Sequence, residues 1–139
     1  MKKLIVLFVA TLSLCITSCG SDDDGVSQDA LIGSWQFSQE FENGELITSD
    51  PCDLQDVVTF NADGTFTGRS FEDDGTGTCV ELEGITGTWE NGGNNVYSFT
   101  SDGETDTETI TFSANTFSIE YSETFEGTTT VYREVYTRI

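Results

Sequence analysis

The feature that most constrains the fold is a series of short segments rich in Thr, Val, Ile, Phe and Tyr, each followed by turn-forming residues. These segments fill residues 31–139, where helix signals are nearly absent. We predict strands at residues 33–41, 55–60, 65–71, 78–90 (which Gly84 could interrupt), 95–100, 106–112, 116–122 and 129–138. The stretch from Leu31 to Ile139 is long enough for one domain with one core. The expected fold class is therefore all-β.

Explicit turn signals link strands that follow each other in the sequence. Asn61-Ala62-Asp63-Gly64 separates two aromatic-bearing runs, and Asn91-Gly92-Gly93-Asn94-Asn95 follows Trp89. Hairpins between sequence neighbours give an antiparallel up-and-down meander. A meander of about eight strands closes into a small barrel, because closure leaves no exposed edge.

Alternation along the strands nominates the interior. The residues expected to share an inner face are Trp35, Phe37 and Phe41; Val58 and Phe60; Gly87 and Trp89; Tyr97 and Phe99; Ile110 and Phe112; and Phe117, Ile119 and Tyr121. Glu104, Asp106 and Glu108 alternate in step with Ile110, so a regular strand would point them into the interior. Three arrangements avoid a buried row of acids: the acids sit beyond the rim in a loop, a bulge switches the faces, or the acids ring the barrel mouth.

Residues 1–18 have the composition of a secretory signal. Met1-Lys2-Lys3 is a basic start, Leu4 to Ile16 is almost wholly apolar, and small residues precede Cys19. The apolar segment from Leu4 to Ile16 is shorter than the roughly 20 residues that a membrane-spanning helix needs. We expect residues 1–18 to be a signal peptide that is removed on export.

The ending Ile16-Thr17-Ser18-Cys19 resembles the lipobox of bacterial lipoproteins. The resemblance implies that Cys19 becomes the first residue and carries the lipid anchor, with acyl chains such as palmitate. Residues 19–30 are then a lipidated tether, and its acidic run 20–27 resembles the tag of surface-displayed Bacteroidota-type lipoproteins. The expected location is the outer membrane, exposed at the cell surface or otherwise facing the periplasm.

The charge of the exported chain excludes one class of partner. Without residues 1–18 it keeps three arginines, no lysine and all 25 acidic residues, a formal net charge of −22. Such a surface repels nucleic acid and anionic headgroups and keeps a tethered protein soluble. We expect no nucleic-acid partner, membrane contact through the lipid at Cys19, and a monomer.

Two cysteines remain when Cys15 leaves with the signal and Cys19 takes the lipid. They are Cys52 and Cys79, and an exported protein usually joins such a pair. The loop-entropy relation gives a disulfide between these two positions roughly 3.5 kcal/mol of stabilisation. A thiol metal site is the alternative, but two cysteines in a chain without histidine make a poor zinc site. We predict a disulfide, no metal and no cofactor.

Several motifs together resemble small bacterial lipocalin-like lipoprotein domains, from Leu31 to the last strand. They are Leu31-Ile32-Gly33-Ser34-Trp35, an early cysteine at Cys52, Val58-Thr59-Phe60-Asn61-Ala62-Asp63-Gly64-Thr65-Phe66, a second cysteine at Cys79, and Gly87-Thr88-Trp89. The resemblance implies that Trp35 plugs one end of the barrel and that an arginine of the last strand stacks on it. Arg133 and Arg138 are the two candidates; alternatively, both arginines only meet surface carboxylates.

The residues for common catalytic chemistry are missing. A chain without histidine lacks the usual general base, the serine triad and most transition-metal sites. It also has no glycine-rich phosphate loop or serine elbow, and the acids at 102–108 do not match a calcium-loop spacing. We expect that the protein is not an enzyme.

The expected function is binding of a small apolar ligand, with Trp89, Phe99 and Phe112 as the ligand-binding side chains. The alternative is a non-enzymatic cell-surface interaction module, in which a side-chain-filled barrel presents loops to a protein or glycan. A domain confined to residues 31–139 has short loops and a narrow interior. Interior volume discriminates between the two functions.

Overall fold

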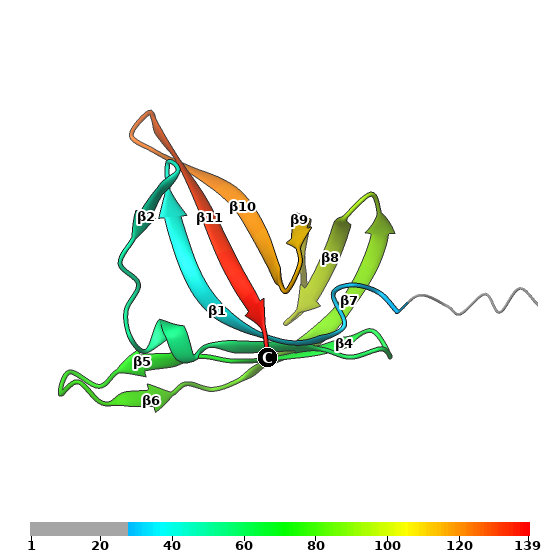
Figure 1. The fold of residues 1–139 in the computed structure, drawn as a ribbon, viewed down its shortest axis with the longest axis horizontal. Helices are drawn as coiled ribbons and strands as arrows, with labels where there is room; N and C mark the ends of the chain where they lie inside the picture. Colours follow the sequence, from blue (N-terminus) through cyan, green and yellow to red (C-terminus); the bar gives the residue numbers. More distant parts are fainter. Residues whose placement is uncertain (1–27) are drawn as a thin grey trace, which may run out of the picture.

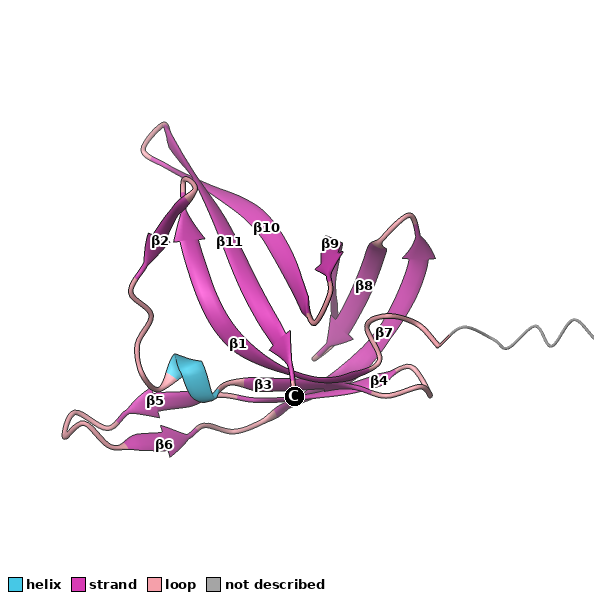
Figure 2. Ribbon diagram, in the orientation of Figure 1, coloured by secondary structure: helices cyan, strands magenta, loops and turns pink. Residues whose placement is uncertain are grey.

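The computed structural model describes residues 28–139, which form eleven strands and one short 3-10 helix (Figure 2). The strands are β1 Gly33–Glu42, β2 Glu45–Ile47, β3 Val57–Phe60, β4 Thr65–Arg69, β5 Phe71–Asp73, β6 Cys79–Glu81, β7 Ile85–Gly93, β8 Val96–Ser101, β9 Glu104–Ser113, β10 Thr116–Phe125 and β11 Thr128–Arg138, and the helix η1 is Asp53–Gln55. Each predicted strand is present, and Gly84 lies in the gap between β6 and β7. This part of the chain contains no helix long and apolar enough to cross a membrane.

Eight of the strands close into a barrel. The sheet runs in the order β11, β10, β9, β8, β7, β4, β3, β1, and β11 also pairs with β1 (Figure 1). All of these pairings are antiparallel. β2 pairs with the end of β1, while β5 and β6 form a separate hairpin inserted between β4 and β7. The predicted all-β, up-and-down barrel is confirmed.

The two ends of the barrel differ in what borders them. The chain enters β1 at one end, and the β3–β4, β7–β8 and β9–β10 turns lie at that same end. At the opposite end lie η1, the β8–β9 turn and the β5–β6 hairpin (Figure 1). We call the first the closed end and the second the open end.

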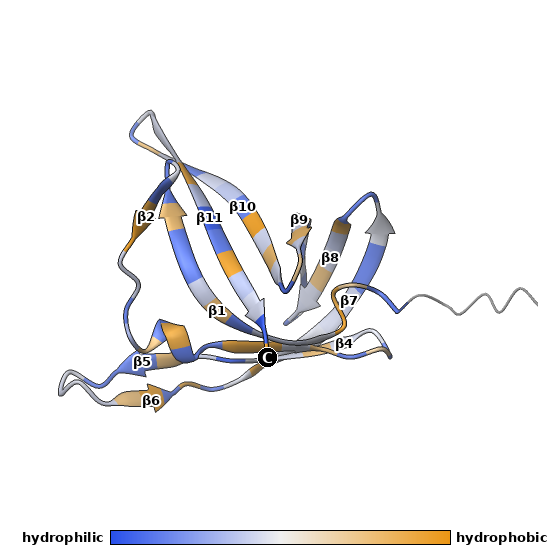
Figure 3. Cartoon of the chain, viewed as in Figure 1, coloured by the Kyte–Doolittle hydropathy of each residue, from blue (hydrophilic) through white to orange (hydrophobic). Residues whose placement is uncertain are grey.

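Aromatic side chains pack together toward the closed end. The buried core consists of Leu31, Trp35, Phe60, Phe66, Trp89, Tyr97, Ile110 and Phe117. The Trp35 and Phe117 rings meet edge to face with centroids 4.8 Å apart, and Phe117 stacks on Tyr136 at the same distance. Hydrophobic and hydrophilic residues alternate along β1, β10 and β11, as expected for strands with one buried face (Figure 3).

A β-bulge in β1 changes which side chains face the interior. The register with β11 shifts between Phe37 and Gln39, so Ser38 is the extra residue. The Ser38 hydroxyl donates to the carbonyl of Val135 at 2.8 Å, which holds the bulge against β11. One extra residue in a strand reverses the inside–outside alternation beyond it.

The prediction that Phe41 shares the inner face with Trp35 and Phe37 is therefore wrong. Beyond the bulge, Phe41 pairs with Arg133, whose guanidinium carbon lies 3.9 Å from the centroid of the Phe41 ring. Glu40 pairs instead with Glu134, and both line the interior at the open end. The bulge thus replaces an aromatic side chain by a carboxylate in the barrel mouth.

The predicted disulfide is present. Cys52 and Cys79 are joined, with a Cα–Cα distance of 5.3 Å and a sequence separation of 27 residues. Cys52 precedes η1 and Cys79 begins β6, so the bond fastens η1 to the β5–β6 hairpin at the open end. Cys52 is only 2% exposed. The bond constrains the segments that border the barrel mouth.

Candidate functional site

The closed end is plugged by Trp35 and covered by Arg138. Trp35 is 1% exposed, and its indole N–H donates to the carbonyl of Leu31 at 2.7 Å. The guanidinium carbon of Arg138 lies 4.0 Å from the centroid of the Trp35 ring. Arg138 also donates to the carbonyls of Ile32 and Ala30, at 2.8 and 2.7 Å. The stacking arginine left open by the sequence is Arg138.

Gly33 makes room for this stack. Its φ is 134°, a conformation that residues with a Cβ rarely adopt. A Cβ at position 33 would also collide with a guanidinium nitrogen of Arg138. The glycine of the Gly33-Ser34-Trp35 motif is therefore required where the arginine crosses the start of β1.

A second polar cluster ties the chain leading into β1 to the β7–β8 hairpin. The Tyr97 hydroxyl donates to Asp29 Oδ1 at 3.0 Å, and the Asn91 amide donates to Asp29 Oδ2 at 2.5 Å. Burial and the adjacent Asp29 carboxylate raise the pKa of Tyr97 to about 12. This cluster and the Trp35–Arg138 stack together seal the closed end.

The open end holds a cavity of about 510 Å³. Its apolar wall includes Val58, Phe60, Phe66, Ile85, Phe99, Phe117 and Ile119. Small residues, Gly68, Ser70 and Ser101, line the cavity nearer the mouth, and the Ile85 side chain lies over Gly68. The volume lies in the range of small-molecule sites, so the expected narrow interior is found only in the closed half.

The wall between β9 and β10 is paired only near the closed end. Pairing of the two strands ends at Ile110 and Ile119, although both continue toward the open end. Beyond that point β10 pairs with β11 and β9 with β8. The strands therefore separate at the mouth, which widens the opening of the cavity.

Carboxylates of β9 face the mouth. β9 pairs with β8 without a bulge: Asp106 lies opposite Phe99, and Glu104 lies opposite Ser101. Glu104 and Asp106 both line the cavity. Of the three arrangements that the sequence left open for these acids, the structure has the one in which they border the mouth.

Further carboxylates line the same mouth from β1, β11 and the residue that precedes β3. Glu40, Asp56 and Glu134 line a smaller hollow that shares Asp56 and Tyr136 with the main cavity. The hydroxyl of Tyr136 donates to Glu134 at 2.8 Å, and that of Tyr121 donates to Glu134 at 3.2 Å. These hydroxyls hold the Glu134 carboxylate inside the mouth.

Burial and mutual repulsion act on these acids. Burial first, and then the charge of Glu134, raises the pKa of Glu40 above its usual value. Burial raises the pKa of Asp56 as well, against the opposing effect of the backbone N–H that Phe71 donates to it. Burial, Asp106 and Glu134 likewise raise the pKa of Glu108. Besides burial, the charge of Glu134 therefore contributes to the raised pKa of all three carboxyl groups.

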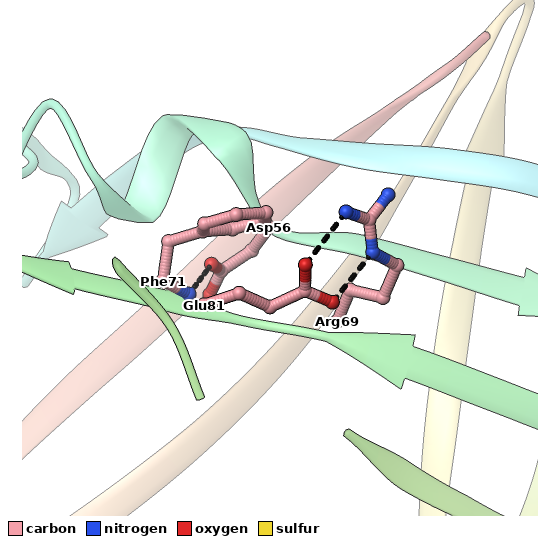
Figure 4. Close-up of polar contacts among 4 residues, drawn as sticks. All are labelled: Asp56, Arg69, Phe71 and Glu81. Atoms are coloured by element: carbon pink, nitrogen blue, oxygen red, sulfur yellow. Dashed lines mark hydrogen bonds and ion pairs between the residues drawn. The ribbon is translucent and has the colours of Figure 1, made fainter. Parts of the chain in front are cut away.

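Arg69 is the cationic residue that borders the cavity, and Glu81 already pairs with it. Its guanidinium donates twice to the Glu81 carboxylate, both times at 2.8 Å (Figure 4). This fork lies between β4 and β6, next to the Asp56 carboxylate that accepts the Phe71 N–H (Figure 4). The charge of Arg69 is therefore paired with the Glu81 carboxylate.

The predicted ligand-binding residues are only partly brought together. Phe99 lines the cavity, whereas Trp89 and Phe112 are not part of its lining. Trp89 is 8% exposed and donates its indole N–H to the carbonyl of Asn61 at the closed end. Phe112 packs against Tyr97 and Phe117. Both rings lie near the closed end. Alternation along a strand predicts which side chains point inward, but it does not predict how far along the barrel axis each of them lies.

Most of the apolar wall was not predicted as a ligand site. Val58, Phe60, Phe117 and Ile119 were placed in the core by alternation, yet they face the cavity as well. The sequence carries no signal that separates these cavity residues from the buried core, because both sets share the inward face of the same strands. Among residues 28–139, no group of three or more metal-binding side chains is arranged to hold a metal ion.

An eight-stranded up-and-down barrel, plugged at one end and open at the other onto a cavity, belongs to the class of small barrels that can hold one small molecule. The comparison with protein families agrees with this class. The model of the lipocalin-like domain matches residues 31–119, so the chain belongs to the lipocalin-like domain family. No curated protein sequence is significantly similar to the chain.

Proposed function

We propose that the barrel binds a small apolar ligand in the cavity at its open end. The observation that carries the proposal is the cavity of about 510 Å³ with a wall of aromatic and aliphatic side chains. Pockets of this size and lining enclose most of the surface of a small molecule. The apolar wall stabilises such a ligand by about 25 cal/mol for each Å² of apolar surface removed from water.

The cavity favours this function over an interaction module with a solid barrel. A module of that kind needs no interior space, and the closed half of this barrel illustrates such packing. The open half instead leaves Phe99 and Ile119 in contact with an accessible volume. We propose binding without catalysis, in keeping with a chain that has no histidine.

We further propose that the domain is held at the outer membrane by lipid on Cys19, exposed at the cell surface or otherwise facing the periplasm. Cys19 and the signal peptide at residues 1–18 lie outside the described residues, so this proposal rests on the sequence motif. The Cys52–Cys79 disulfide supports export, because disulfides persist in oxidising compartments.

A cavity-filling variant tests the binding function. Ile119→Trp places an indole in the cavity, whereas Thr111→Trp places the same ring on the exposed face of β9. We expect the unmodified protein and Thr111→Trp to raise the fluorescence of the neutral apolar dye Nile red, and Ile119→Trp to abolish most of the rise. Equal responses from all three proteins would contradict binding in the cavity.

The anchor is tested separately. Growth of the host with labelled palmitate should label the protein, and Cys19→Ala should remove the label. Protease added to intact cells then distinguishes the two orientations, because a surface-exposed domain is degraded and a periplasm-facing domain is protected. An unlabelled product in the presence of Cys19 would contradict lipid anchoring.

A further inference from the structure

We propose that the ligand of the cavity is a cationic amphiphile, an apolar body bearing an ammonium-type group. The inference deepens the proposed function and rests on it. The apolar body would lie against Phe60, Phe99 and Ile119, and the positive group would lie among the carboxylates of the mouth. Those carboxylates favour a cationic ligand over a neutral one because of their charge, their placement and their lack of a cationic partner within residues 28–139.

Carboxylates approach the mouth from several sides of the barrel. Glu104 and Asp106 come from β9, Asp56 directly precedes β3, and Glu134 belongs to β11. A cation entering the cavity from the open end therefore passes negative side chains on opposite walls. Charge lining a cleft with low-dielectric walls concentrates ions of the opposite sign within it.

The three arginines of the described residues leave this charge uncompensated. Arg138 covers Trp35 at the closed end, and Arg133 lies over Phe41 on the outer face. Arg69 borders the cavity but forks onto Glu81. Burial is the main cause of the raised pKa values of Asp56 and Glu108, and the charge of Glu134 adds to it at both positions.

This arrangement disfavours an anionic amphiphile such as a fatty acid. A carboxylate headgroup at the mouth would meet Asp106 and Glu134 and no unpaired cationic side chain among the described residues. Its apolar chain would gain the same contacts as that of an amine. The charge of the headgroup therefore decides between the two ligands.

A metal ion fits the mouth less well than an organic cation. The carboxylates are spread around the opening, and the described residues hold no three of them in a metal-binding arrangement. A metal ion would also leave the apolar wall of the cavity unused. An amphiphile uses both parts, since its body replaces water against the wall and its charge stays at the mouth.

Three probes with the same twelve-carbon chain test the inference: dodecylammonium, dodecanol and dodecanoate, each competing with Nile red below its aggregation concentration. At low ionic strength we expect dodecylammonium to displace the dye at about tenfold lower concentration than dodecanol. Dodecanoate should be weaker than dodecanol. Added salt should reduce the difference between the charged probes, because it screens the mouth.

Two substitutions remove charge from the mouth, and one removes the same charge elsewhere. Asp106→Asn and Glu134→Gln should each weaken dodecylammonium about threefold while leaving dodecanol unchanged. Glu120→Gln is the matched control, because Glu120 is exposed and pairs with Arg133 on the outer face of β10. Unchanged dodecanol binding also shows that each variant is folded.

The outcomes separate this inference from the proposed function. Dodecanoate binding as tightly as dodecylammonium would overturn the cationic ligand and leave an apolar-ligand barrel standing. An equal effect of Glu120→Gln would assign the preference to overall charge and overturn the role of the mouth. Loss of the ammonium preference in stoichiometric calcium would assign the carboxylates to a metal and overturn the inference. Failure of all three probes to displace Nile red would overturn binding of such amphiphiles altogether.

Discussion

The guanidinium of Arg138 covers the indole of Trp35, with its carbon 4.0 Å from the ring centroid. The stack joins the last strand of the barrel to the first, next to the hydrogen bonds that Arg138 donates to Ile32 and Ala30. It therefore fastens the closing seam of the barrel and the residues that precede β1.

We predict that Arg138→Gln lowers the free energy of unfolding by about 1 to 2 kcal/mol, because it removes the cation–π contact and at least one hydrogen bond of a charged donor. Arg133→Gln is the control, since Arg133 lies over Phe41 outside the core. It should cost at most about 1 kcal/mol. Urea unfolding of the two variants makes the comparison, and an Arg138 variant as stable as the unmodified protein would rule out this role.

The Cys52–Cys79 bond should contribute substantially to stability. The double variant Cys52→Ala/Cys79→Ala should lose roughly 3.5 kcal/mol, because removing the cross-link between residues 27 positions apart restores conformational entropy to the unfolded chain. Unfolding in urea, with and without reductant, measures the loss. Reduction should bring the unmodified protein close to the variant and leave the variant unchanged; a reductant-insensitive midpoint for both proteins would contradict the prediction.

Glu40→Gln should stabilise the protein at neutral pH. The pKa of Glu40 is raised in the folded state, so ionisation of this group costs stability as the pH rises through that pKa. The gain should be no more than about 1 kcal/mol, because solvent screens a group this close to the surface. This gain in stability should vanish below pH 4.5, the usual pKa of a glutamate carboxyl group. Unfolding free energies at pH 7 and pH 4 measure the difference, and a gain that persists at pH 4 would assign it to another cause.

Tyr97 should make the fold sensitive to alkali. Its pKa rises from 10.0 to about 12 on folding, so its contribution is complete below pH 10 and is lost as the pH rises toward 12. Tyr97→Phe should cost about 1 kcal/mol at pH 8 through loss of the hydrogen bond to Asp29. At pH 11 this difference should shrink by about 1 kcal/mol. A difference independent of pH would contradict the placement of the phenol beside the carboxylate.

The sequence was sufficient for the eight barrel strands, the closure and the disulfide, since these follow from local patterns, whereas the short strands β2 and β5 were not predicted. Alternation and turn residues mark the hairpins. Because each hairpin pairs strands that are neighbours in the sequence, the strand order around the barrel follows the order in the chain. The pairing of Cys52 with Cys79 followed from the count of cysteines left after the expected signal peptide and lipid anchor.

Features that depend on pairing between distant strands were not predictable. The bulge at Ser38 has no local signal, because it depends on the register of β1 with β11, and it exchanges Phe41 for Glu40 inside the barrel. The choice of Arg138 over Arg133 depends on the same register. The depth of Trp89 along the barrel axis follows from strand stagger, which a single sequence does not specify.

The position of a bound apolar ligand shows directly whether the cavity is the binding site. Dodecanol added to isotopically labelled protein should give intermolecular nuclear Overhauser effects to the methyl groups of Val58 and Ile119 and to the ring of Phe99, which line the cavity. Effects confined to Leu46 and Phe125, which are 60% and 77% exposed, would place the ligand on the surface. That result would contradict the central claim that the open half of this barrel is a binding site.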